Sequence, residues 1–129
     1  MPEDRQGKLF LGPEDLVYRA FSRALDLNGR VSDKDFRLRP NSVETVLSVA
    51  LTPEKAMGEL SCRGYVALRA GSIAEIGLTL VRKAAEEDPG YWEIVGIPIG
   101  DFDAEQDFAI ALAKAAEEPV LVPGRRRRE

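Results

Sequence analysis

Four short apolar runs constrain the fold of this chain more than any other feature of its sequence. They are rich in valine, leucine and isoleucine, and they cover residues 43–50, 64–69, 76–81 and 91–97. Apolar runs of about 4–8 residues between turn or polar residues are typical of β-strands. A shorter run from Val120 to Val122 predicts a last strand. The sequence therefore predicts a sheet.

Helix-start signals lie between and after these runs. Thr52-Pro53-Glu54 places an N-cap residue, a first-position proline and a first-turn acid in order, which predicts a helix over 53–61. Asp103 is followed three residues later by Gln106, the spacing of a capping box. That pair predicts a second helix over 103–116.

Two further segments are ambiguous. Pro13-Glu14-Asp15 has the composition of a helix start, and apolar residues then recur at helical spacing, so we expect a helix over 13–25. The run from Leu16 to Phe21 also fits a strand, and this alternative stays open. Ser72 to Glu75 predicts a short turn or helix before the strand that begins at Ile76.

These elements together predict an α+β fold, in which three main helices pack on a small mixed sheet of about four to five strands. The 129 residues match the usual size of one domain. We expect a flexible N-terminal segment over 1–12, a single α+β domain over 13–122 and a flexible Arg-rich tail over 123–129.

The single cysteine, Cys62, indicates the compartment. One cysteine cannot form an internal disulfide, whereas secreted domains of this size often carry several. The charged start resembles no signal peptide, and no apolar run approaches the ~20 residues of a membrane helix. We expect a cytoplasmic protein without a membrane contact. Cys62 itself is expected to be a buried apolar residue; the alternative is a thiolate activated by Arg63.

Charge is distributed unevenly along the chain. Residues 1–83 carry 13 basic and 11 acidic side chains, residues 84–118 carry one basic and ten acidic, and the tail ends with four arginines and Glu129. The acidic stretch would repel nucleic-acid phosphates, so it predicts a protein partner with a basic surface. Nucleic acid is expected to bind only through the arginine run.

Tyr91 and Trp92 are neighbours in a predicted strand and therefore point to opposite faces of the sheet. We expect at least one of them in the core, and an exposed one would indicate a partner site. The predicted partner-binding residues are Glu86, Glu87, Asp88, Trp92, Asp101, Arg125, Arg126, Arg127 and Arg128.

The chain contains no histidine. This excludes nucleophile schemes that need a histidine base, and it removes the commonest zinc ligand. We expect no metal and no cofactor. The segment Gly96–Gly100 joins a strand to a helix as phosphate-binding loops do, but Asp101 and Asp103 lie where the anion would go, so we interpret it as structural.

Five short segments, spread over most of residues 16–122, carry a family resemblance: Leu16-Val17-Tyr18-Arg19, Gly29-Arg30-Val31-Ser32 with Phe36, Leu47-Ser48-Val49, Glu93-Ile94-Val95-Gly96-Ile97-Pro98, and Ala111-Leu112-Ala113. In them the chain resembles a group of small bacterial proteins with no assigned function. That group often has a histidine two positions before the glutamate, where this chain has Tyr91. An activity that used the histidine would be lost here.

The order Arg19, Ser48 and Glu93 is similar to the Arg, Ser and Glu order of ADP-ribosyltransferases. The resemblance implies that Arg19 holds a nicotinamide dinucleotide, that Ser48 orders the site, and that Glu93 polarises the ribose. These three are the candidate catalytic residues. The alternative places Arg19 in a surface pair and Ser48 buried in the sheet.

We therefore expect a small binding or interaction module without enzymatic activity. The family resemblance suggests an accessory role in a bacterial defence or toxin–antitoxin-like system. The alternatives are a NAD- or nucleotide-binding transferase that uses Arg19, Ser48 and Glu93, and a homodimeric structural protein whose exposed strand edges pair.

Overall fold

The computed structural model describes residues 11–36, 47–58, 62–82, 90–98 and 100–122. The strands are β1 (Leu16–Phe21), β2 (Leu47–Ala50), β3 (Gly64–Arg69), β4 (Thr79–Arg82), β5 (Tyr91–Val95) and β6 (Val120–Leu121). The helices are the short 3₁₀ helix η1 (Asp33–Phe36), α1 (Pro53–Met57), α2 (Ala70–Ile76) and α3 (Phe102–Ala115).

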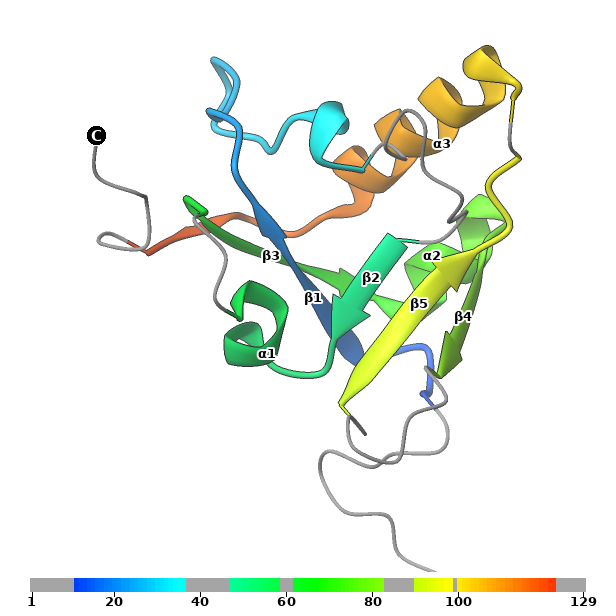
Figure 1. The fold of residues 1–129 in the computed structure, drawn as a ribbon, viewed down its shortest axis with the longest axis horizontal. Helices are drawn as coiled ribbons and strands as arrows, with labels where there is room; N and C mark the ends of the chain where they lie inside the picture. The colour runs from blue at the N-terminus through cyan, green and yellow to red at the C-terminus, as the bar shows by residue number, and fades with distance from the viewer. Residues whose placement is uncertain (1–10, 37–46, 59–61, 83–89, 99, 123–129) are drawn as a thin grey trace, which may run out of the picture.

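The six strands form one sheet in the order β4-β5-β2-β1-β3-β6 (Figure 1). Every pair of neighbouring strands is antiparallel. The α+β class is thus confirmed, but the expected mixed sheet of four to five strands is corrected to an antiparallel sheet of six. The additional strand is β1.

β1 lies where a helix over 13–25 was expected, and that prediction is wrong because none of these residues is helical. All six residues pair with β3, from Leu16 opposite Arg69 to Phe21 opposite Gly64, and Tyr18 also pairs with Ala50 of β2. A helix this short is unstable on its own, whereas a strand between two others has backbone partners on both sides. The strand alternative for this segment is therefore correct.

α2 and β4 also differ from the prediction. The short turn or helix expected over 72–75 is a helix, but it begins at Ala70 and continues through Ile76, so the strand begins at Thr79 and not at Ile76. Gly77 ends the helix with a φ of 103°, a left-handed conformation that favours glycine. Leu78 N donates to Ile73 O at 3.1 Å, which completes a Schellman-type ending.

The other two helices begin close to the predicted positions. Thr52 caps α1 by accepting a hydrogen bond from Lys55 N at 3.2 Å, as its sequence predicts. The cap of α3 is Asp101, whose Oδ1 accepts from Ala104 N at 3.0 Å, and not the predicted Asp103. Residues 59–61 of the first predicted helix and 43–46 of the first predicted strand lie outside the described residues.

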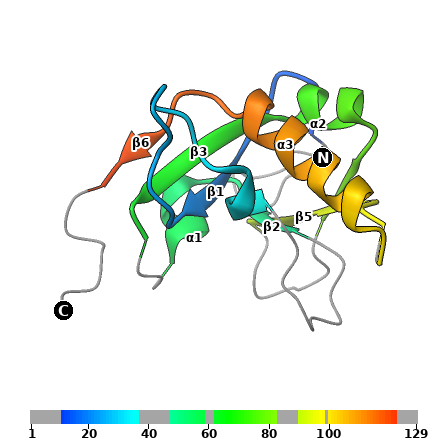
Figure 2. The ribbon, with the colours of Figure 1, turned by 90° about the horizontal axis from the view of Figure 1, so that it is seen from above.

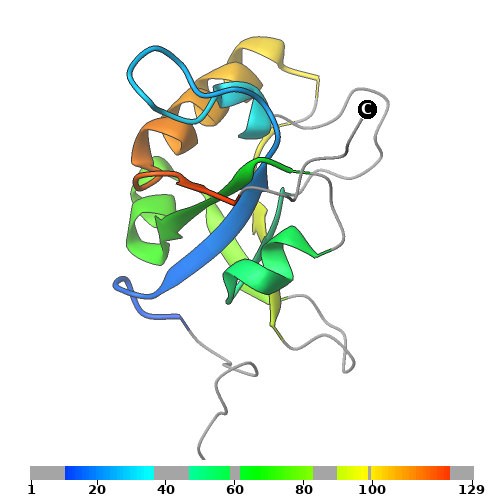
Figure 3. The same cartoon turned by 90° about the vertical axis from the view of Figure 1, so that its left-hand side faces the viewer.

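The two faces of the sheet are covered differently. Figures 2 and 3 show α2, α3 and η1 on one side of the sheet and α1 on the other. We call the first side the core face, because Val17, Val49, Leu68 and Ile94 alternate onto it and pack with Leu112 of α3 in one apolar cluster. The second side is the α1 face. It carries Tyr18 and Tyr65, whose rings meet edge to face at 5.8 Å.

Candidate functional site

Arg19 lies on the core face, directly opposite the buried Val66 of β3. Its Nε donates to Asp35 O at 2.9 Å, and one terminal nitrogen donates to Ser48 O at 2.7 Å. The guanidinium lies 5.9 Å from the centre of the Phe36 ring, within cation–π range. Arg19 therefore ties β1 to η1 and to the backbone of β2.

Ser48 and Glu93 are direct partners across β2 and β5. Ser48 lies in the sheet but is exposed, so the alternative that buries it there is wrong; Glu93 is half-buried. Since Leu47 and Val49 point to the core face, alternation places Ser48 and Glu93 on the α1 face. The structure brings the three strands of the candidate triad together, but the sheet separates the Arg19 side chain from the other two.

The predicted partner-binding residues have different environments. Trp92 is only 5% exposed and belongs to the core, while Tyr91 is half-buried on the α1 face and donates its hydroxyl to Lys55 O at 3.2 Å. Asp101 is exposed at the start of α3. The remaining candidates, Glu86, Glu87, Asp88 and Arg125 to Arg128, lie outside the described residues.

Acidic side chains line α3 and the segment that follows it. Over residues 100–122 the chain has one basic residue, Lys114, and six acids, of which all but the half-buried Glu105 are exposed. We name the set of these acids the α3 acidic surface: Asp101, Asp103, Glu105, Asp107, Glu117 and Glu118. Asp101 is also the N-cap of α3, and Asp103 and Glu105 in its first turn interact favourably with the positive end of the helix dipole, so these three have a structural role as well.

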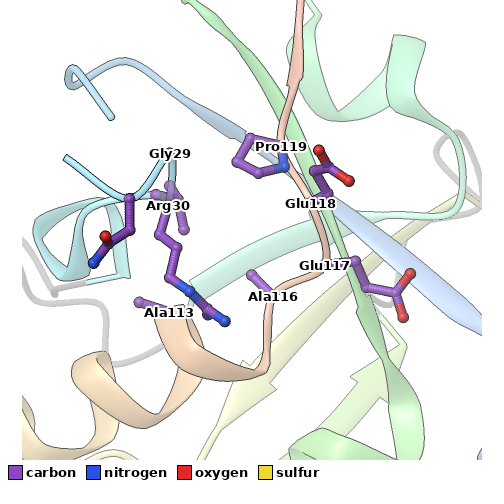
Figure 4. A pocket seen from close by; sticks show the side chains of 9 residues that line it. Gly29, Arg30, Ala113, Ala116, Glu117, Glu118 and Pro119 are labelled. Atoms are coloured by element: carbon purple, nitrogen blue, oxygen red, sulfur yellow. The ribbon is translucent and has the colours of Figure 1, made fainter. Parts of the chain in front are cut away.

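A cavity of about 340 Å³ opens at the C-terminal end of α3. Figure 4 shows it between the loop around Arg30 and the segment from Ala116 to Pro119. We call it the end cavity; it is lined by Asn28, Gly29, Arg30, Val31, Ala113, Ala116, Glu117, Glu118 and Pro119. Its volume falls in the range of small-ligand and side-chain pockets.

The loop that forms one wall of the end cavity is held by Asp26. The Asp26 Oδ1 accepts from Asn28 N at 2.8 Å and from Arg30 N at 2.9 Å, and Gly29 has a φ of 77°. Leu27 at the tip of this loop is fully exposed. The Asn28-Gly29 pair indicated a turn in the sequence, but nothing local indicated that the turn would face the end of α3.

Two charged side chains of the end-cavity wall, Arg30 and Glu117, already interact with other groups of the protein. Arg30 donates to Lys114 O at 3.4 Å, at the negative end of the α3 dipole. The Glu117 carboxylate lies 3.0 Å from Arg69, which also contacts Glu14 at 2.8 Å. The hydrogen bond and charge of Glu117, followed by the charge of Glu14, raise the pKa of the exposed Arg69 above its usual value.

Other site types have little support in the described part of the chain. There, no group of three acid or cysteine side chains could hold a metal ion, and Cys62 is buried. Nor does any helix within the described ranges have the length and apolar character needed to cross a membrane. Comparisons with protein-family models, with curated proteins and with solved structures found no match for this chain. The α3 acidic surface and the end cavity are therefore the two features that bear on function.

Proposed function

We propose that this protein is an interaction module that binds a basic segment of a partner protein along the α3 acidic surface. One apolar side chain of the partner would enter the end cavity. The observation that carries the proposal is the gathering of exposed carboxylates along and after α3: Asp103 and Asp107 lie on its first half, and Glu117 and Glu118 line the end cavity, whose wall is partly polar and partly apolar.

Geometry supports an extended peptide as the bound segment. A 14-residue helix is about 21 Å long, which an extended chain covers with about six residues. Ala113, Ala116 and Pro119 provide a small apolar floor at one end of this path (Figure 4). The exposed Leu27 stands on the loop beside that floor and adds apolar contact area.

Charge supports a cationic partner over an anionic one. Among the described residues that line the cavity, Arg30 is the one cation, and it is directed at a carbonyl of the last turn of α3. The two glutamates beside it leave the wall with a net negative charge. Nucleic-acid phosphates would be repelled along the same path, so we do not propose nucleic acid as the partner of this surface.

The transferase hypothesis has less support. It needs one pocket around Arg19, Ser48 and Glu93, whereas Arg19 points to the core face and is bound to backbone carbonyls. The homodimer, the cytoplasmic location and the role in a bacterial defence or toxin–antitoxin-like system stay predictions from the sequence.

The proposal can be tested with a fluorescent peptide that alternates arginine and leucine. We expect saturable binding, measured by fluorescence anisotropy, that weakens as ionic strength rises. Reversing two exposed acids in the double variant Asp107→Lys/Glu118→Lys should weaken binding by at least about tenfold, because two attractive pairs become repulsive.

The matched control is Glu54→Lys/Glu75→Lys, which makes the same change in net charge on α1 and α2. This control should retain most of the affinity. Equal losses in both double variants would show that only net charge matters, and an alternating glutamate–leucine peptide that binds as well would contradict the proposal.

A further inference from the structure

A second cavity, of about 410 Å³, lies between α2 and β4, away from the end cavity. We call it the α2 cavity; it is lined by Leu11, Ala70, Ala74, Leu78, Thr79, Leu80 and Trp92. Apart from Thr79, all of these side chains are aliphatic or aromatic. The small side chains of Ala70 and Ala74, one helical turn apart, leave the space open. The wall therefore suits an apolar occupant.

The chain just before β1 is fixed across the start of α2. Ala70 N donates to Asp15 O at 2.8 Å, and Gly71 N donates to Pro13 O at 3.0 Å. A Cβ placed on Gly71 would lie only 3.0 Å from Pro13 Cβ, so this stretch lies directly against the helix. These contacts set the position of Leu11, which packs against the apolar core and lines the α2 cavity.

Two apolar residues, Leu9 and Phe10, come directly before Leu11 in the sequence. Both lie outside the described ranges. Residues 3–8, which precede them, are charged, polar or glycine. Consecutive Cα atoms are about 3.8 Å apart, so the pair begins one residue away from a side chain of the cavity wall. The apolar part of this segment thus adjoins the cavity through its covalent connection alone.

We propose that the α2 cavity is the docking site of this chain's own N-terminal segment, whose Leu9 and Phe10 side chains pack against Ala74, Leu78 and Leu80. Docking removes the apolar surface of both partners from water, which is favourable. The segment is tethered at the cavity wall, so its docking is intramolecular and costs less entropy than the capture of a free molecule. Its release would open the hollow to a small uncharged apolar molecule.

Nuclear Overhauser effects in the unmutated protein test the docked state directly. We expect cross-peaks from the Leu9 methyls and the Phe10 ring to the methyl groups of Ala74 and Leu80. This readout needs no variant and therefore does not depend on whether a substituted chain folds. If cross-peaks from the pair to these methyls are absent, the proposal is overturned.

Competition with octan-1-ol tests whether the pair closes the cavity. Trp92 is the only tryptophan of the chain and lines the cavity, so its fluorescence reports the binding of this probe. The double variant Leu9→Ser/Phe10→Ser should bind octan-1-ol about tenfold more tightly than the unmutated protein, because the probe no longer has to displace the pair. The matched control Asp4→Ser/Gln6→Ser, in the polar part of the same segment, should bind it as the unmutated protein does.

Two results of the competition would overturn the proposal. Equal affinities of all three proteins for octan-1-ol would show that the N-terminal segment does not occupy the cavity. No binding to a folded Leu9→Ser/Phe10→Ser variant would show that loss of the pair does not open it.

Discussion

Arg19 was a candidate catalytic residue from the sequence, but in the structure its side chain holds neighbouring segments together. It alternates with Val17 and Phe21 onto the core face, where a charged side chain is costly unless its donors are bonded. The carbonyls of Asp35 and Ser48 and the Phe36 ring meet that need. The residue therefore links three segments that are distant in sequence.

The variant Arg19→Leu should lower the free energy of unfolding by about 1–3 kcal/mol, because two carbonyls lose a charged donor. Urea denaturation followed by circular dichroism measures this change. Arg23→Leu, at an exposed position four residues later, is the matched control and should change stability by less than about 0.5 kcal/mol. Equal stability of the two variants would show that the Arg19 contacts contribute nothing.

Leu27 permits a second prediction at the same scale. Because its side chain is fully exposed, Leu27→Asp should leave the unfolding free energy within about 0.5 kcal/mol of the original. If the end cavity and its loop form the partner surface, the same change should still weaken binding of the arginine–leucine peptide several-fold. If Leu27→Asp bound the peptide with unchanged affinity, the loop would not be part of the proposed surface.

Among the elements, the pairing of β3 with β6 depends on a close backbone approach. Gly64 pairs with Leu121, and a Cβ placed on Gly64 would lie 1.9 Å from the Val120 carbonyl oxygen. No side chain fits at that distance, so the strand that follows α3 reaches the sheet only because residue 64 is glycine. β6 in turn holds the end of the segment that lines the end cavity.

The substitution Gly64→Ala should therefore displace β6 and cost about 1–3 kcal/mol of stability, as overpacking usually does. Hydrogen exchange provides the local readout: the amide of Val122, which donates to Arg63 O at 2.9 Å, should exchange faster. Gly12→Ala is the control, since its Cβ would meet nothing closer than 3.7 Å. Unchanged exchange at Val122 would contradict this account of the β3–β6 contact.

At the scale of the whole molecule, one apolar cluster joins the sheet to α2, α3 and η1. Val17 from the first strand and Leu112 from the last helix are both fully buried in it. Elements from the two ends of the chain therefore depend on the same core. The described part of the chain should unfold as one unit.

Leu112→Ala should cost about 2–5 kcal/mol, because it leaves a cavity in this shared core. Lys114→Ala, at an exposed position of the same helix, should cost less than about 0.5 kcal/mol. Trp92 fluorescence and far-ultraviolet circular dichroism should report the same unfolding transition in each of these two variants. If fluorescence and circular dichroism gave different unfolding midpoints for the unmutated protein, α3 and the sheet would unfold independently.

Prediction from the sequence succeeded where local signals agree. The apolar run at 64–69 forms β3, the run at 91–97 contains the shorter β5 (Tyr91–Val95), and Thr52 caps a helix that starts at Pro53. It failed at 16–21, where the same residues fit both helical and strand spacing, and at 103, where the nearby Asp101 is the cap. The end cavity was not predicted, because its walls come from residues more than 80 positions apart.

The sequence by itself determined the α+β class, most of the strands and the concentration of acids around α3, because apolar periodicity, helix caps and charge are local properties. Only the tertiary structure decided that residues 16–21 join the sheet between β2 and β3, and that Arg19 faces away from Ser48 and Glu93. Strand order and register depend on which distant backbone groups satisfy one another, and no local pattern in the chain encodes that choice.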